Sequence, residues 1–158
     1  MTCCVEHNRR GNERVSPGSA SLRTVRSAAR RSIASFDQIL DTAAVESGYD
    51  HPSEAYLANH LDVFGEEGLW DAVRRHDEPA RAATWLRILG RSDRLSHRLR
   101  AELLVWGLRS SSVDVRDAAV QAAENWSDRR LVGVLRGHVE PVDWLQEYAS
   151  GVVRGMEA

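Results

Sequence analysis

A nine-residue pattern that occurs twice constrains the fold of this chain more than any other feature. The segment AVRRHDEPA, residues 72–80, aligns with VLRGHVEPV, residues 134–142, and the matched pairs are Arg74 with Arg136, His76 with His138, Glu78 with Glu140 and Pro79 with Pro141. The two copies are 62 residues apart, from position 74 to position 136. Half of that spacing, about 31 residues, suits one helical hairpin, which needs stacked neighbours to bury its apolar face. The repeat therefore predicts a fold built from stacked helical hairpins.

Proline, glycine and capping residues divide the chain beyond residue 34 into a series of helices. The pattern SFDQ predicts a capping box that starts at Ser35. Pro52 and Pro79 suit the first turn of a helix, and Gly65 and Gly90 suit helix ends. Apolar residues recur at helical spacing between these positions, and no segment alternates with the period typical of strands. We expect helices over about 35–48, 52–65, 66–76, 79–90, 93–109, 113–126, 128–136 and 142–154.

The connections between these helices predict how they are arranged. Each loop has only a few residues, which makes neighbouring helices antiparallel. Small residues on one face of segment 113–126, among them Ala118, Ala119 and Ala122, allow another helix to approach closely. We therefore predict an all-α fold over residues 35–158, arranged as an α-solenoid, a right-handed stack of about four antiparallel helical hairpins.

The segment DVRDAAVQAAENWSDRRLVGVL, residues 114–135, resembles a HEAT repeat. It is similar in particular to the short bacterial HEAT-like repeats related to those of phycobilin lyases. Three of the residues that carry the resemblance begin the second helix of a unit, and two begin the next pair. They are Val115, Arg116, Ala119, Asp128 and Arg130. The resemblance is good over about residues 66–155, weaker over 35–65 and absent before that.

The resemblance implies an extended surface for binding other proteins more than it implies any chemistry. The chain departs from the repeat pattern at two places. Trp126 stands where glycine is usual, and Asp143 with Trp144 interrupts the Val-Arg pattern of the last unit. We expect a non-enzymatic scaffold or adaptor that binds a protein partner through its concave surface, acting as a regulator or as a neutralising partner.

Residues 1–34 differ in composition from the rest of the chain. The first 35 residues carry seven Arg against Glu6 and Glu13, a balance of +5, which leaves −7 for the remainder of a chain whose net charge is −2. We expect a basic, poorly ordered leader here. An organelle transit peptide, an over-long start and a basic arm that contacts nucleic acid or an acidic partner are the alternatives.

Composition also bounds the cellular setting. All 21 basic residues are arginine, which is typical of a GC-rich bacterial coding sequence. The two cysteines, Cys3 and Cys4, are adjacent and form neither a disulfide framework nor a Cys-x-x-Cys pair, which indicates a reducing cytoplasm. No segment has the apolar length of a membrane span. The acidic body disfavours nucleic acid as the main partner, since that affinity comes from a surplus of basic charge.

The repeated His-x-Glu pairs, His76 with Glu78 and His138 with Glu140, have a metal-binding interpretation and a structural one. Imidazole and carboxylate are common metal ligands. Each pair, however, lies at a turn where a polar residue caps one helix and Glu-Pro begins the next. We therefore expect no metal site and no cofactor. No Gly-rich phosphate loop, nucleophile elbow or zinc-protease motif is present, so we expect no catalytic residues.

Aromatic and arginine side chains are the candidate partner-binding residues. Most of the five tryptophans lie on apolar stripes, but Trp70 and Trp144 have acidic neighbours and are candidate interface anchors. Arg81, Arg87 and Arg116 fall on second helices, where they would line a groove for an acidic peptide or a phosphate backbone.

Two alternatives accompany these candidates. The three arginines are also placed for ordinary ion pairs with residues such as Asp117 and Glu124. A nucleic-acid-binding repeat protein that uses the leader and these arginines is the alternative function. If the chain self-associates, a second copy would cover the apolar residues of the last helix, which are Val152, Val153 and Met156.

Overall fold

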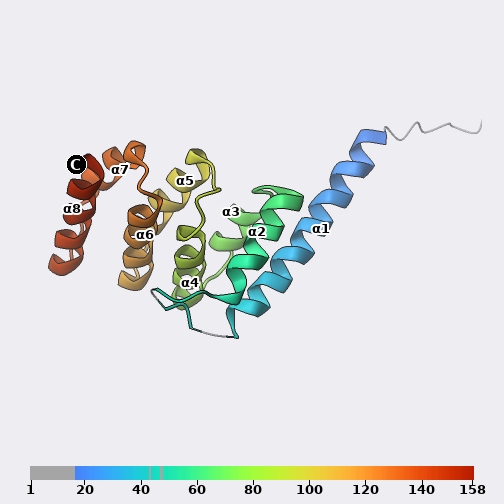
Figure 1. Ribbon diagram of the computed structural model, residues 1–158, viewed down its shortest axis with the longest axis horizontal. Helices are drawn as coiled ribbons and strands as arrows, with labels where there is room; N and C mark the ends of the chain where they lie inside the picture. The colour runs from blue at the N-terminus through green and yellow to red at the C-terminus, as the bar shows by residue number, and fades with distance from the viewer. Residues whose placement is uncertain (1–16, 43, 47) are drawn as a thin grey trace, which may run out of the picture.

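The computed structural model describes residues 17–42, 44–46 and 48–158, and these residues contain helices and no strands (Figure 1). The fold is therefore all-α, as predicted. The helices are α1 (Pro17–Leu40), α2 (Pro52–Phe64), α3 (Leu69–Arg74), α4 (Pro79–Gly90), α5 (His97–Leu108), α6 (Val113–Trp126), the short 3₁₀ helix η1 (Arg129–Leu131), α7 (Val132–Gly137) and α8 (Asp143–Glu157). None of the described helices is long and apolar enough to cross a membrane.

Helix α1 corrects the start predicted at Ser35 and, with it, the boundary expected at residue 34. The helix already begins at Pro17, and Ser35 lies inside it, where its hydroxyl donates to the Arg31 carbonyl. Beyond Gly18 no glycine or proline interrupts this segment, so its alanine and arginine residues favour a continuous helix. Buried Ala29 and Ile33 belong to the core. Residues 1–16 of the expected leader lie outside the described residues.

The other helix bounds follow local capping chemistry. The bounds predicted for α4 and α6 are confirmed, and α2 ends one residue before the predicted position. Helix α3 begins late because Gly68, at a φ of 82°, adopts the left-handed conformation that breaks the chain before it. Helix α5 also begins later than expected, after Ser96, whose hydroxyl accepts a hydrogen bond from the Leu99 amide.

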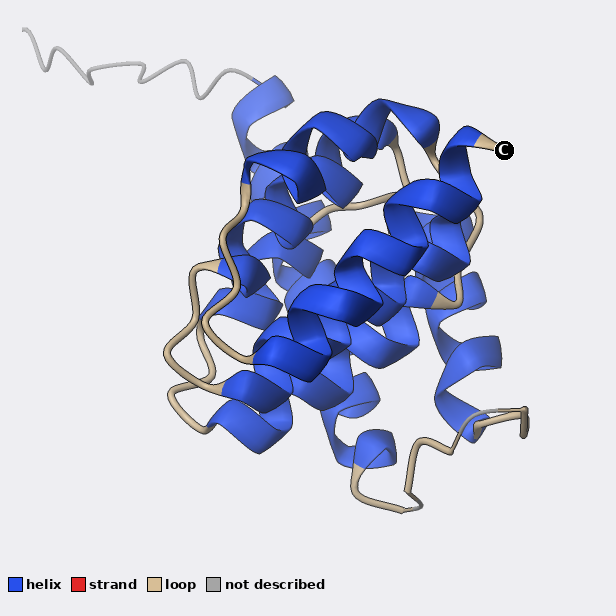
Figure 2. Cartoon of the chain, turned by 90° about the vertical axis from the view of Figure 1, so that its left-hand side faces the viewer, coloured by secondary structure: helices blue, strands red, loops and turns tan. Residues whose placement is uncertain are grey.

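The helices form two layers, with α3, α5 and α7 on one side and α4, α6 and α8 on the other, while α1 and α2 lie at the amino-terminal end (Figure 1). Consecutive helices pack in pairs, and α6 also packs against α4 and α8. Figure 2 looks at the molecule from the α8 end, where α8 covers the row. Val152, Val153 and Met156 of α8 are buried within the chain itself, so they do not need a second copy to cover them.

Small residues set the spacing between α6 and its neighbours α4 and α5. A Cβ added to Gly90 of α4 would lie 2.7 Å from the Cα of Ala122 in α6. A Cβ added to Gly107 of α5 would lie 2.6 Å from the Cβ of Ala119. Both distances are shorter than real contacts, so the backbones approach as closely as the small residues of α6 predicted.

Two tryptophans anchor the core through both ring and indole N–H. Trp85 is fully buried, packs against Phe36 of α1, and donates to the Asp37 carboxylate at 2.9 Å. Trp126 donates to the Leu89 carbonyl at 3.1 Å. Each indole therefore bonds to a residue of another helix that is more than thirty positions away in the sequence.

Candidate functional site

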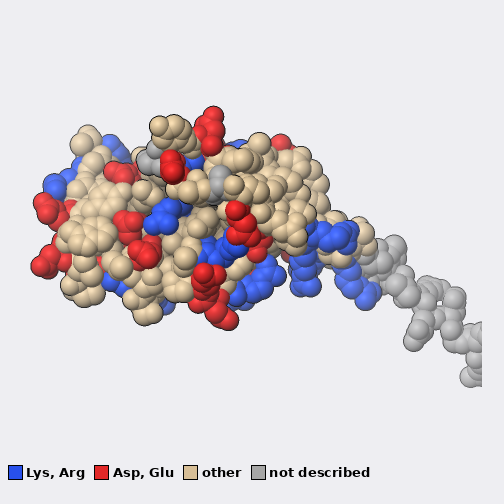
Figure 3. All heavy atoms as spheres, turned by 90° about the horizontal axis from the view of Figure 1, so that it is seen from below, with Lys and Arg blue, Asp and Glu red and all other residues tan. Residues whose placement is uncertain are grey.

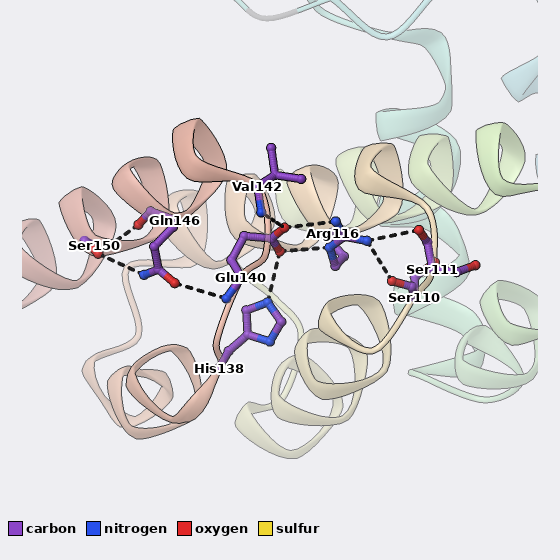
Figure 4. A network of polar contacts seen from close by, with 8 residues as sticks. All are labelled: Ser110, Ser111, Arg116, His138, Glu140, Val142, Gln146 and Ser150. Carbon is purple, nitrogen blue, oxygen red and sulfur yellow. Dashed lines mark hydrogen bonds and ion pairs between the residues drawn. The ribbon is translucent and has the colours of Figure 1, made fainter.

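The turn between α7 and α8 is held by an ion pair that is almost completely buried (Figure 4). Arg116 of α6 donates to both oxygens of Glu140, from Nε to Oε2 at 2.8 Å and from Nη2 to Oε1 at 2.9 Å. The side chains are only 8% and 1% exposed. This two-point geometry is the strong form of the arginine–carboxylate pair, and it fixes the turn relative to α6.

Further hydrogen bonds satisfy the rest of both groups. The His138 Nε2 donates to Glu140 Oε2 at 3.1 Å, and the Val142 amide donates to Glu140 Oε1 at 3.1 Å. The remaining guanidinium nitrogen of Arg116 donates to the carbonyls of Ser110 and Ser111, at 3.0 and 3.1 Å. The network therefore connects the loop before α6 to the turn before α8.

The first turns of α8 are tied to the same network. The Glu140 amide donates to Gln146 Oε1 at 3.0 Å, and Gln146 Nε2 donates to the Ser150 hydroxyl at 3.2 Å. Ser150 in turn donates to the Gln146 carbonyl. The backbone and the side chain of Glu140 are therefore both bonded, and together they tie the turn to α6 and α8.

The buried pair shifts the acid–base behaviour of both members. Hydrogen bonds from Arg116 lower the pKa of Glu140 from 4.5 to about 2, against the opposing effect of burial, and the His138 hydrogen bond adds to the lowering. The same hydrogen bonds raise the pKa of Arg116. Glu140 is thus ionised throughout the neutral range, and the turn keeps its anchor there.

The anchored turn presents apolar side chains to solvent. Val139 is 85% exposed and Trp144 is 54% exposed, while Glu140 between them points inward. Pro141 is exposed as well. We call Val139, Pro141 and Trp144 the turn surface.

Of the two tryptophans predicted as anchors, the structure leaves only Trp144 open to solvent. Trp70 is half-buried and packs against the core. Its ring meets Trp106 edge-on, with centroids 6.4 Å apart, and the Arg74 guanidinium lies 5.9 Å from its centroid. Trp70 therefore serves mainly to join α3 and α5.

The three predicted groove arginines do not form a common positive site. Arg81 pairs with Asp41, and Arg87 lies 3.6 Å from Asp117. Arg116 is buried against Glu140 and is inaccessible to any partner. Each of the three arginines therefore has a carboxylate partner, and the partner of Arg87 is Asp117. Pairings such as Arg81 with Asp41 join residues forty positions apart, which helical spacing does not predict.

The two His-x-Glu copies have different environments. The His76 ring stacks on Trp85, and burial lowers the pKa of His76. The nearest carboxylate to His76 belongs to Asp37, at 3.6 Å, and Glu78 is exposed. Among residues 17–42, 44–46 and 48–158, no three metal-ligating side chains lie close enough to hold an ion. The sequence repeat therefore marks two turns and not two copies of one site.

Asp128, one of the residues that suggested HEAT repeats, connects the start of α5 to η1. Its carboxylate caps η1 by accepting from the Arg130 amide at 3.1 Å, and it accepts from the Arg130 side chain at 2.8 Å. His97 at the start of α5 donates to the same carboxylate at 2.9 Å. These hydrogen bonds, that from the Arg130 side chain above all, lower the pKa of Asp128 far below its ordinary range.

A hollow of about 600 Å³ lies where Val45 and residues 48–50, in the loop before α2, meet α4 and α6. Arg91 holds this loop by donating to the Glu54 carboxylate and to the carbonyls of Tyr49 and Glu46. Arg91 and Glu54 also line the hollow, and its other charged residues are Asp50, Arg87, Asp93 and Glu124. The hollow therefore has more carboxylates than guanidiniums, which is the reverse of the arginine-lined groove expected from the sequence.

No protein-family model matches the chain, and neither the curated proteins nor the solved structures contain a match.

Proposed function

We propose that this protein is a non-enzymatic adaptor that binds another protein through the turn surface. The observation that carries the proposal is the exposure of Trp144 and Val139 on a turn that a buried ion pair holds in place. Binding energy at protein interfaces is concentrated in a few residues, and tryptophan is enriched among them. An anchor that is already fixed also loses little conformational freedom when a partner binds.

We infer further that the helix pairs form a HEAT-like, right-handed stack of hairpins. Support comes from the two helix layers and from the roles of Arg116 and Asp128. Both residues belong to the pattern that resembles HEAT repeats, and each bonds to a neighbouring helix pair. In such a stack, the layer of α4, α6 and α8 would form the concave side, and the mixed-charge hollow would lie between α4 and α6 on it.

The charge distribution supports a protein partner over nucleic acid for this surface. Arg81, Arg87 and Arg116 are already neutralised by carboxylates, so they contribute little net attraction to phosphates. The exposed anchors Val139 and Trp144 are apolar. We place the adaptor in a bacterial cytoplasm, on the arginine-only basic composition and the two adjacent cysteines.

The test is a comparison of partner recovery between matched surface variants. Tagged wild-type protein, Trp144→Ala and Val63→Ser are used to recover proteins from the source organism after nuclease treatment, with quantitative mass spectrometry. Val63 of α2 is 61% exposed and lies away from the turn, so it is the matched control. We expect a protein recovered by wild type and Val63→Ser to fall at least about tenfold with Trp144→Ala. Equal recovery by all three forms, or loss of recovery after nuclease treatment, would contradict the proposal.

A further inference from the structure

The apolar stripe of α1 continues beyond the part of the helix that the other helices cover. Ala29, Ile33, Phe36 and Leu40 are buried on one face of this helix. Leu22 and Val25 continue the same face at helical spacing, since they precede Ala29 by seven and four positions. They are 64% and 45% exposed, on the part of α1 that projects from the molecule (Figure 1). A core-type stripe is therefore left without a partner over two turns.

A basic groove lies directly beside this stripe. It has a volume of about 870 Å³ and runs between α1 and α3, with Arg26 and Arg30 on one wall and Arg74 and Arg75 on the other. Figure 3 shows arginine side chains gathered on this projecting part of α1. Two carboxylates in the groove neutralise part of this charge, as Glu67 lies 3.4 Å from Arg26 and Asp71 lies 3.0 Å from Arg74.

The remaining two arginines give the groove its net positive charge. Arg30 and Arg75 are exposed, and neither has a carboxylate partner within the part of the chain that the structure describes. This differs from the α4–α6 face, where Arg81 and Arg87 are both paired. Four arginines against two carboxylates leave a charge of about +2 next to an uncovered apolar stripe.

We propose that this groove and stripe dock an acidic amphipathic helix of another protein. Such a helix places apolar residues against Leu22 and Val25 and carboxylates against Arg30 and Arg75, so it satisfies both features at once. A nucleic acid would use the arginines and leave the apolar stripe exposed. The stripe of a second copy would bring a second set of α1 arginines against the first, and like charges in contact oppose that association.

The groove forms a surface separate from the turn surface. Helix α1 lies at one end of the molecule and α8 at the other (Figure 1). The inference rests on the proposed function only in that the protein binds proteins. With docking surfaces at both ends, one chain bridges two partners, which is what an adaptor must do.

The experiment measures binding of a defined probe to the full chain. The probe is a labelled synthetic helix of about three heptads, with Leu at positions a and d and Glu at e and g. A second probe carries Lys in place of Glu. Fluorescence anisotropy is expected to show binding of the acidic probe alone. The affinity is expected to fall at least about tenfold in the Arg30→Glu/Arg75→Glu variant, and as much in Leu22→Glu.

Matched variants separate this site from general charge effects. Arg109→Glu/Arg129→Glu changes the net charge equally at exposed positions away from the groove, and Val63→Glu matches Leu22→Glu. Both control variants should bind the acidic probe like wild type. So should Trp144→Ala, so that failure of the turn surface and failure of the groove are distinguishable. Unchanged circular-dichroism melting shows that each variant is folded.

Three results would overturn the inference. The first is no binding of the acidic probe, or equal loss of binding in the control variants. The second is a concentration-dependent dimer, measured by light scattering, that Leu22→Glu dissociates, because a second copy would then cover the stripe. The third is salt-sensitive binding of a short DNA duplex or RNA strand that needs Arg30 and Arg75 but not Leu22, because the groove would then be a phosphate-binding site.

Discussion

At the scale of single residues, Arg116 and Glu140 form the most buried ion pair among the residues that the structure describes. Replacing one member leaves the other charge buried and unpaired, and such a loss costs about 3–5 kcal/mol. Sequence reasoning identified both residues but assigned them to different features, a groove and a repeated turn. Their partnership joins positions 24 apart, with the rest of α6, η1 and α7 between them, and nothing in the local spacing predicts it.

We predict that Glu140→Gln lowers the free energy of unfolding by about 3 kcal/mol, because the guanidinium of Arg116 then remains buried without a counter-charge. Glu102→Gln is the matched control, since Glu102 pairs with Arg98, whose side chain is 88% exposed. That substitution should cost less than about 1 kcal/mol. Urea titration followed by circular dichroism measures both. Similar costs for the two variants would show that the buried pair does not stabilise the turn.

The same carboxylate predicts how stability depends on pH. The pKa of Glu140 is about 2 in the folded protein and 4.5 as its ordinary value. A lowered pKa stabilises the folded state fully above pH 4.5, and this contribution is lost as the pH falls from 4.5 toward 2.

Urea titrations at several pH values should show the difference between wild type and Glu140→Gln shrinking across that window. The lowered pKa of Asp128 acts in both proteins and cancels in the comparison. A difference that stays constant from pH 6 to pH 2 would contradict the account.

At the scale of helices, the prolines, glycines and capping residues predicted most of the elements correctly. Helices α2 and α4 begin at prolines, and Gly90 ends α4, so their bounds follow from backbone chemistry. The prediction for α1 was wrong because the capping pattern at Ser35 lies inside a helix whose apolar stripe begins well before it. That stripe, from Leu22 to Leu40, was the available signal for a longer helix.

Glycine substitutions test how closely α4 and α6 pack. Gly90→Ala should destabilise the protein by about 1–3 kcal/mol, because the added Cβ meets the Ala122 backbone and the clash exceeds the gain in helix propensity. Gly151→Ala in α8 is the control, since its nearest neighbour is the end of the Arg154 side chain at 3.7 Å. It should stabilise by about 0.5–1 kcal/mol. Thermal melting distinguishes the two, and stabilisation by both would mean that α4 and α6 are further apart than described.

At the scale of the whole molecule, charge and apolar surface are distributed unevenly between the two ends. The amino-terminal end carries the basic groove and the exposed stripe of α1, and the carboxyl-terminal end carries the turn surface. The sequence predicted the charge asymmetry and an all-α fold, since both follow from composition and period. It did not predict which arginines lack carboxylate partners, because ion pairs depend on how distant helices pack.

The central claim, that the turn surface contacts another protein, is tested most directly by photo-crosslinking in the source organism. A photoreactive phenylalanine analogue replaces Val139 in one strain and Val63, the exposed control, in another. After irradiation and nuclease treatment, the account predicts an adduct between the position-139 form and another protein, and no such adduct from position 63. Adducts of equal yield from both positions, or an adduct at 139 only with nucleic acid or with a second copy, would contradict it.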